Sequence, residues 1–180
     1  YMHKKSFTAE NFLISVLKRA KELVKGGEKL FATSAFNYFL QDNEKGNLSR
    51  KGLEIFTQLD DSDVLSSIKE WQFHDDLILS KLSRSIIERK LPKSFLMDKE
   101  LTDAELFVEK ERVKEFFKID DASYFVEQTT IKIIPYDKSK NPIKILFKNG
   151  EVKEISNSEK SLLTQFLQQE ITKYHYHSIK

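Results

Sequence analysis

The stretch SRSIIERKLPKSF, residues 83–95, contains the point at which the sequence changes from a helical pattern to a strand pattern. Upstream of Pro92, apolar residues at 78, 82 and 86 recur every four positions, which is the spacing of one helical face. Proline disfavours a helical conformation at the residue before it, so we expect the helix to end there. Lys93 to Met97 is then predicted to be a strand. The sequence therefore predicts two regions, residues 1–92 and 93–180.

Residues 1–92 are expected to form a layer of helices. The first is predicted over residues 8–24, with Thr8 as its N-cap and Gly26-Gly27 as its end. Its apolar residues fall on one stripe, as in an amphipathic helix. Four further helices are predicted. They lie over residues 34–40, directly after the capping residue Ser49, within the stretch 59–72, and over 74–90. Asp60 or Asp61 is the expected cap of the helix within 59–72.

Residues 93–180 are expected to form a small mixed module. A helix over residues 103–118 should turn Leu106, Val113, Phe116 and Phe117 inward. The dipeptide Asn149-Gly150 between alternating apolar residues predicts a β-hairpin. The fold class is therefore predicted to be α+β, with an N-terminal helical layer followed by a small ferredoxin-like antiparallel β module with helices. The other predicted elements are strands at 123–127, 129–135, 142–155 and 171–177, and a helix at 158–168.

The composition limits the classes of function. The 180 residues include 14 Phe and 6 Tyr, which is enough aromatic material to argue against disorder. The net charge of +2 provides no basic field over the whole molecule, so specific nucleic-acid binding is not predicted and any anion site must be a local cluster. Cysteine is absent, which excludes disulfides and cysteine-containing zinc sites. No apolar run approaches the ~20 residues that cross a bilayer, so we predict no membrane association and a cytoplasmic protein.

Two histidine motifs raise the question of a metal site. The stretch WQFHDD, residues 71–76, pairs His74 with Asp75. Acidic residues at a helix start complement the helix dipole, and we favour that interpretation over a metal role. His175 and His177 have the two-residue spacing that places both on one face of a strand. They could chelate zinc with a third ligand, but an edge strand with one polar face is the interpretation we favour. No metal ligand is therefore assigned in this chain.

Several stretches resemble the C-terminal half of bacterial HD-domain deoxynucleoside triphosphate triphosphohydrolases. They are YMHKKSFTAENFLISVLKRAKEL (1–23), LFATSAFNYFLQ (30–41), LDDSDVLSSIKEWQ (59–72), SRSIIERKLPKSF (83–95) and IKILFKNGEVKEIS (143–156). The resemblance spans nearly the whole chain. It implies a fragment that follows the catalytic HD core, whose divalent metal (Mg, Mn, Fe or Zn) and metal ligands would lie upstream of Tyr1. We therefore expect no cofactor in this chain.

The resemblance also implies functional residues. Tyr1 matches a tyrosine that packs beside the substrate sugar. His3 and Lys4 match residues that touch an effector nucleotide, and Arg89 and Lys93 match an arginine and a lysine that bind it. Guanidinium and ammonium groups suit phosphate, although two basic residues at a helix end are also favourable without any ligand. Pro92 stands where relatives tend to have Phe, and it prevents Arg89 and Lys93 from sharing one helical face.

Two hypotheses follow. In the first, the parent protein is a metal-dependent phosphohydrolase acting on (deoxy)nucleoside triphosphates. The chain then contributes a substrate wall, an effector surface and a homo-oligomer interface, while the isolated fragment is inactive. In the second, the chain is a non-enzymatic interaction module that binds no nucleotide.

Overall fold

The first half of the chain is helical, as its apolar spacing predicted. The computed structural model describes residues 4–41, 46–133, 143–154 and 171–178. Within these residues, the helices that precede the first strand are α1 (Lys4–Lys25), α2 (Ser34–Leu40), α3 (Arg50–Phe56), α4 (Asp61–Trp71) and α5 (Leu77–Ile87).

Side chains and glycine define the ends of these helices. The Ser49 hydroxyl accepts the N–H of Gly52 at 2.9 Å, and Asp60 forms a capping box with Asp63. Gly27 ends α1 with a φ of 93°, a conformation that costs glycine little. The predicted caps at Ser49 and Asp60, and the predicted glycine stop, are therefore confirmed.

The predicted cap at Thr8 is wrong. The helix starts four residues earlier, at Lys4, and Thr8 lies inside α1 with no exposed surface. Its hydroxyl lies 3.1 Å from Nε2 of His175, on the last strand. Thr8 continues the row of Phe12, Val16 and Ala20 at four-residue steps, so it belongs to the buried face of the helix.

The second half of the chain contains a three-stranded sheet and one described helix. Strand β1 (Lys93–Met97) is followed by α6 (Asp103–Phe117) and β2 (Glu127–Ile133), and β5 (Ile171–Ser178) pairs with both strands. The order is β1-β5-β2, with β5 antiparallel to each neighbour. A β1-α6-β2 connection with another strand between its two strands is the split β-α-β arrangement of ferredoxin-like modules. The predicted α+β class is confirmed.

Two details of this half differ from the prediction. The segment before β2 is a turn, because the carbonyl of Ala122 accepts the N–H groups of both Phe125 and Val126. In α6, Val113 is buried, but Phe116 is 63% exposed and does not face inward. Phe117 does pack inward, with its ring centroid 5.3 Å from that of Phe125.

The predicted hairpin at Asn149-Gly150 is confirmed. Strands β3 (Lys144–Leu146) and β4 (Val152–Glu154) pair antiparallel across it, and Gly150 has a φ of 83°. The predicted helix at 158–168 lies outside the described residues, as do residues 134 and 135 of the strand predicted at 129–135.

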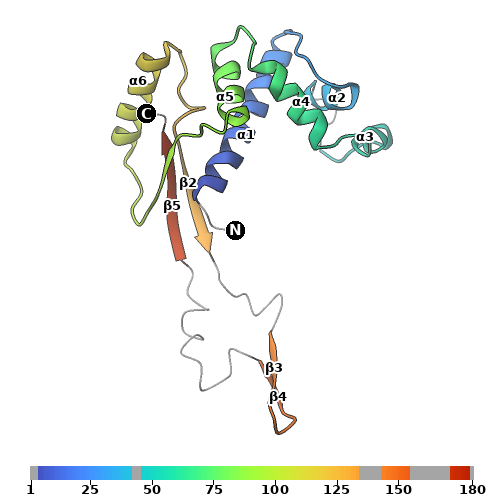
Figure 1. Ribbon diagram of the computed structural model, residues 1–180, viewed down its shortest axis with the longest axis vertical. Coiled ribbons are helices and arrows are strands. Elements are labelled where there is room, and N and C mark those ends of the chain that lie inside the picture. The colour runs from blue at the N-terminus through green and yellow to red at the C-terminus, as the bar shows by residue number, and fades with distance from the viewer. Residues whose placement is uncertain (1–3, 42–45, 134–142, 155–170, 179–180) are drawn as a thin grey trace.

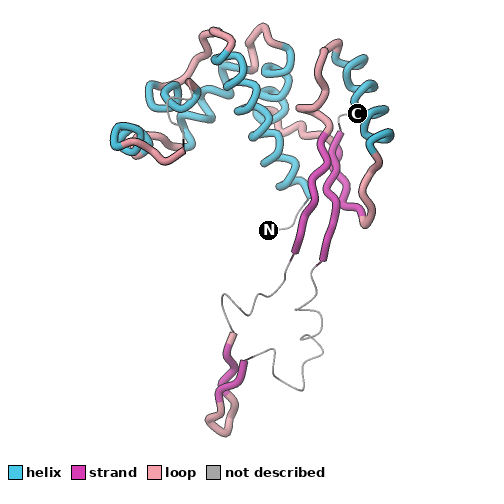
Figure 2. The backbone as a smooth tube through the Cα atoms, turned by 180° about the vertical axis from the view of Figure 1, so that it is seen from behind, coloured by secondary structure: helices cyan, strands magenta, loops and turns pink. Residues whose placement is uncertain are grey.

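The sheet lies between two sets of helices. Figures 1 and 2 show α1 along one face of β2 and β5, and α6 on the other side. One continuous cluster of buried apolar residues includes Phe12 and Trp71 from the helical region together with Phe125 and Tyr176. The division near Pro92 therefore does not separate two hydrophobic cores. None of the described helices is long and apolar enough to cross a membrane.

Candidate functional site

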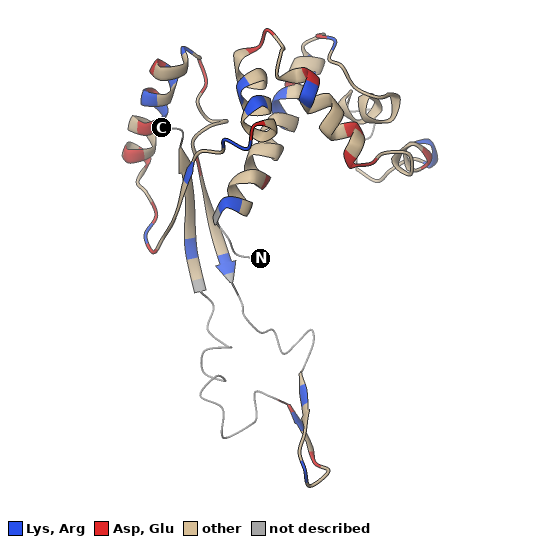
Figure 3. Ribbon diagram, in the orientation of Figure 1, with Lys and Arg blue, Asp and Glu red and all other residues tan. Residues whose placement is uncertain are grey.

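The residues implied by the resemblance lie at the start of α1 and around the start of β1. Tyr1 and His3 are outside the described residues, and Lys4 is the first residue of α1, although its side chain is not described. Lys93 is the first residue of β1 and is exposed. Figure 3 shows basic residues in the segment that joins α5 to β1.

Lys93 and Lys5 line one pocket. Its volume is about 460 Å³, within the range of small-molecule sites, and it is lined by Lys5, Leu91, Pro92, Lys93, Ser94 and Phe95. The two lysines are far apart in sequence and meet because α1 packs against β1. Among the six described lining residues, the ionisable side chains are those of the two lysines. We call this the basic pocket; two ammonium groups around one cavity suit an anionic group such as phosphate.

Arg89 does not line the basic pocket, but its backbone is unusual. It follows the end of α5 with a φ of 56°, in the left-handed region that favours glycine. The N–H groups of Arg89 and Lys90 donate to the carbonyls of Ile86 and Ser85, which closes the helix end. The chain then turns at Leu91-Pro92, so Arg89 and Lys93 do not share a helical face, as the proline predicted. Lys118 has the same conformation at the end of α6, with a φ of 53°, so this backbone geometry reflects the helix end.

The WQFHDD stretch forms a helix start. Asp76 is the N-cap of α5, accepting the N–H of Leu79 at 2.7 Å, and His74 Nδ1 accepts the N–H of Asp76 at 3.0 Å. Two nitrogens of Arg19 also bind the Asp76 carboxylate. Burial opposes the charged form of Asp76, but the hydrogen bonds from Arg19 and Leu79 outweigh it and lower its pKa. The sequence placed Asp76 within the first turn of the helix, whereas in the structure it is the N-cap, one residue before α5 begins.

The interpretation of His175 and His177 as an edge strand is wrong. They lie on β5, the central strand of the three, and neither side chain has exposed surface. Both face α1, where Thr8 and Phe12 cover them. The sequence analysis thus missed the burial of Thr8 and of this pair, and it did not name Lys5 as a residue of the basic pocket. The signal that could have identified Thr8 is its place four residues before Phe12 on the buried row of the helix.

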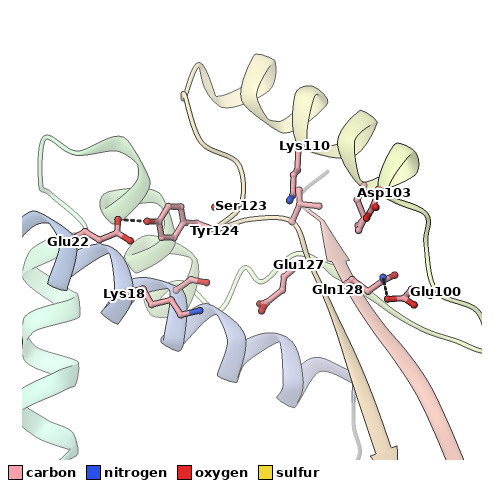
Figure 4. Close-up of a pocket in the computed structure, with 12 residues that line it drawn as sticks. Lys18, Glu22, Glu100, Asp103, Lys110, Ser123, Tyr124, Glu127 and Gln128 are labelled. Carbon is pink, nitrogen blue, oxygen red and sulfur yellow. Dashed lines mark hydrogen bonds between the residues drawn. The ribbon is translucent and has the colours of Figure 1, made fainter. Parts of the chain in front are cut away.

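A second, larger pocket lies between α1, β2 and α6 (Figure 4). Its volume is about 500 Å³, and its lining includes four carboxylates but only two lysines, Lys18 and Lys110. Several of its polar groups already bind each other: the Tyr124 hydroxyl donates to Glu22, and Gln128 donates to Glu100 at 3.2 Å. An excess of carboxylates disfavours a polyphosphate. The basic pocket is therefore the better phosphate site.

The described residues do not provide a metal centre. Within them, no three His, Asp or Glu side chains are gathered so that they could hold a metal ion. His74 and Asp76 form hydrogen bonds at the start of α5, and the sheet histidines have no exposed surface. These residues do not fit a hydrolytic metal, which needs several converging ligands and an open position for water.

Comparison with known proteins connects this fold to a class. No family model matches the chain. The crystal structure of a phosphohydrolase (BT4208) from Bacteroides thetaiotaomicron VPI-5482 matches all of the chain with a TM-score of 0.91 and 31% identity, over 46% of its own length. The uncharacterized protein YwfO of Bacillus subtilis (strain 168) is 29% identical over 171 residues, which cover 87% of this chain and 36% of that protein.

The chain therefore spans less than half the length of the proteins it matches. The whole length of this chain is thus similar to a part of a solved phosphohydrolase.

Proposed function

We propose that the chain is the C-terminal part of an HD-type, metal-dependent phosphohydrolase that acts on (deoxy)nucleoside triphosphates. The observation that carries the proposal is the match of the entire chain to less than half of a solved phosphohydrolase. The metal and the water that it activates belong to the remainder of the protein. This region supplies a phosphate-contact surface and a homo-oligomer interface.

The basic pocket is the phosphate-contact surface in this proposal. Lys5 and Lys93 both line it, and Lys4 precedes Lys5 at the start of α1. Tyr1 and His3 would extend the same contact from the residues before α1. The role of the chain's own residues is to bind and orient a nucleotide, and the hydrolytic step takes place elsewhere.

The test is hydrolysis of dNTPs with Mg²⁺ or Mn²⁺ by the full-length gene product and by this chain. We expect phosphate release from the long protein only. A long protein that hydrolyses no nucleoside triphosphate with either metal would overturn the proposal. Activity of residues 1–180 alone would instead show that the metal site lies within this chain.

A non-enzymatic interaction module is the second candidate. It is favoured by large apolar side chains that are more than half exposed, among them Phe31, Leu53, Phe56 and Phe73. Measurement of the mass of this chain in solution decides whether these surfaces drive association. A monomer at high concentration would count against the module and against the proposed homo-oligomer interface.

A further inference from the structure

Two histidines are enclosed between the central strand and α1. His175 and His177 are separated by two positions on β5, so both side chains point to the same face of the sheet. Their ring centroids are 5.7 Å apart, and neither residue has exposed surface. The centroid of Phe12, on α1, lies 5.3 Å from that of His177.

The histidine pair is in direct contact with side chains from the first turns of α1. The Thr8 hydroxyl lies 3.1 Å from Nε2 of His175, and the Phe7 ring packs 5.8 Å from the His175 ring. Thr8 follows Lys5, which lines the basic pocket, by less than one helical turn. The position of Lys5 relative to β1 therefore depends on how the start of α1 packs on this pair.

The position of His177 disfavours its protonated, positively charged form. Neither of its ring nitrogens has a hydrogen-bond partner among the described residues. Burial, together with the neighbouring His175, lowers the pKa of His177 to about 4. The neutral ring can remain in this buried position, whereas an imidazolium there would lose its hydration.

The charged groups on the elements that face His177 do not offset the lowering of its pKa. On β2, Glu127 pairs in register with His177; burial raises the pKa of Glu127, although Lys18 of α1 opposes that rise. On β1, the residue opposite His177 is Ser94, which is not ionisable. On α1, Lys5 lines a pocket with Ser94 and adds positive charge. Only Glu127 would favour a charged His177.

We propose that His175 and His177 are positioning residues that hold the first turns of α1 on the sheet, and that protonation of His177 releases these turns. The release displaces Lys5 from the basic pocket, so the phosphate-contact surface is intact near neutral pH and opens in acid. The part of this inference that concerns nucleotide contact rests on the function proposed above.

The first arm of the test measures amide hydrogen exchange at residues 4–12 in the full-length protein, between pH 7 and pH 5, with intrinsic rates corrected. A folded pKa of about 4 against an ordinary value of 6.5 predicts that protection falls about 20-fold over that range. His177→Phe replaces the ring with one that cannot be protonated and should remove most of this dependence. His74→Gln, at the start of α5, is the matched control and should retain it.

Equal pH dependence in the wild type and in His177→Phe would overturn the proposal. If His177→Phe does not fold, the ring resonances of the wild-type histidines decide the question. A His177 that stays neutral until about pH 4 supports the proposal, and one that titrates near 6.5 overturns it.

The second arm measures binding of dGTP to the same proteins from pH 7 to pH 5. We expect wild-type affinity to fall in parallel with the protection of residues 4–12, and the affinity of His177→Phe to fall less. Absence of dGTP binding at every pH would count against the proposed function but leave the exchange result standing. Binding that is lost equally in both proteins would overturn the link between the histidine pair and the basic pocket.

Discussion

Arg19 and Asp76 form a two-point ion pair that joins the middle of α1 to the start of α5. Nη2 of Arg19 lies 2.6 Å from Oδ2 of Asp76, and Nε lies 3.1 Å from Oδ1. The same carboxylate caps α5 through the N–H of Leu79. The hydrogen bond to Asp76 is the main reason that the pKa of Arg19 is raised. One carboxylate thus fixes both a helix start and the contact between two helices.

Replacement of this carboxylate should destabilise the fold. Asp76→Ala removes the cap and one partner of a part-buried ion pair, and we expect a loss of about 2 kcal/mol in the free energy of unfolding. Asp76→Asn keeps an oxygen for the N–H of Leu79 and should lose less. Asp75→Ala, at the exposed neighbour, is the control. Urea unfolding measures all three, and equal stability of Asp76→Ala and Asp75→Ala would contradict the role of the pair.

The Arg19–Asp76 pair should also make the free energy of unfolding depend on pH in the acid range. Because the pKa of Asp76 is lowered in the folded protein, its contribution is present above the ordinary value of 3.8 and is lost as the pH falls below it. The difference in stability between wild type and Asp76→Ala should therefore shrink below pH 4. Urea midpoints at pH 6 and pH 3 measure this change.

Arg89 offers a test that separates backbone strain from side-chain function. Arg89→Gly relieves a φ of 56°, so the free energy of unfolding should be unchanged or rise by up to about 1 kcal/mol. If the guanidinium contacts phosphate, dGTP affinity should nevertheless fall. Lys118→Gly is the matched control, because Lys118 has a φ of 53° at the end of α6. It should show the same effect on stability with no change in affinity.

Local signals allowed most helix boundaries to be predicted. Ser49, Asp60 and Gly26-Gly27 act through hydrogen bonds and dihedral angles within a few residues, so the sequence alone contains the relevant information. The Asn149-Gly150 hairpin is local in the same sense. The predicted change from helix to strand near Pro92 is confirmed by the start of β1 at Lys93, but α5 ends earlier than predicted, at Ile87, where Arg89 turns the chain with a φ of 56°.

Features that depend on long-range pairing could not be predicted in this way. Alternation placed His175 and His177 on one face, but only the β1-β5-β2 order makes their strand central and that face buried. Threonine is a residue type that often caps helices, but the Thr8 hydroxyl lies against the ring of His175, which is 167 residues away in the sequence. The contact of Lys5 with the pocket beside Lys93 likewise depends on how α1 packs against β1.

Tyr124 should contribute to a decline of stability in alkali. Burial and its hydrogen bond to Glu22 raise its pKa to about 12, so the folded protein retains a proton that the unfolded chain releases near 10. The contribution of Tyr124 to the free energy of unfolding is therefore fully present below pH 10 and is lost as the pH rises toward 12. The loss amounts to about 1 kcal/mol at pH 11. Tyr124→Phe should reduce this slope in urea unfolding between pH 8 and pH 11. Tyr38→Phe, on α2, should leave the slope unchanged.

The basic pocket predicts a loss of nucleotide affinity when its lysines are removed. In the full-length protein, Lys93→Ala and Lys5→Ala should each weaken dGTP binding by about tenfold at low ionic strength, because under the proposed function each would remove a charge-assisted hydrogen bond to phosphate. Higher salt should reduce the difference from wild type, since exposed charges are screened. Lys99→Ala, an exposed lysine just beyond β1, is the control and should bind normally. Calorimetric titration with dGTP at two salt concentrations measures the effect, and equal losses in all three variants would mean that net charge, not the pocket, controls binding.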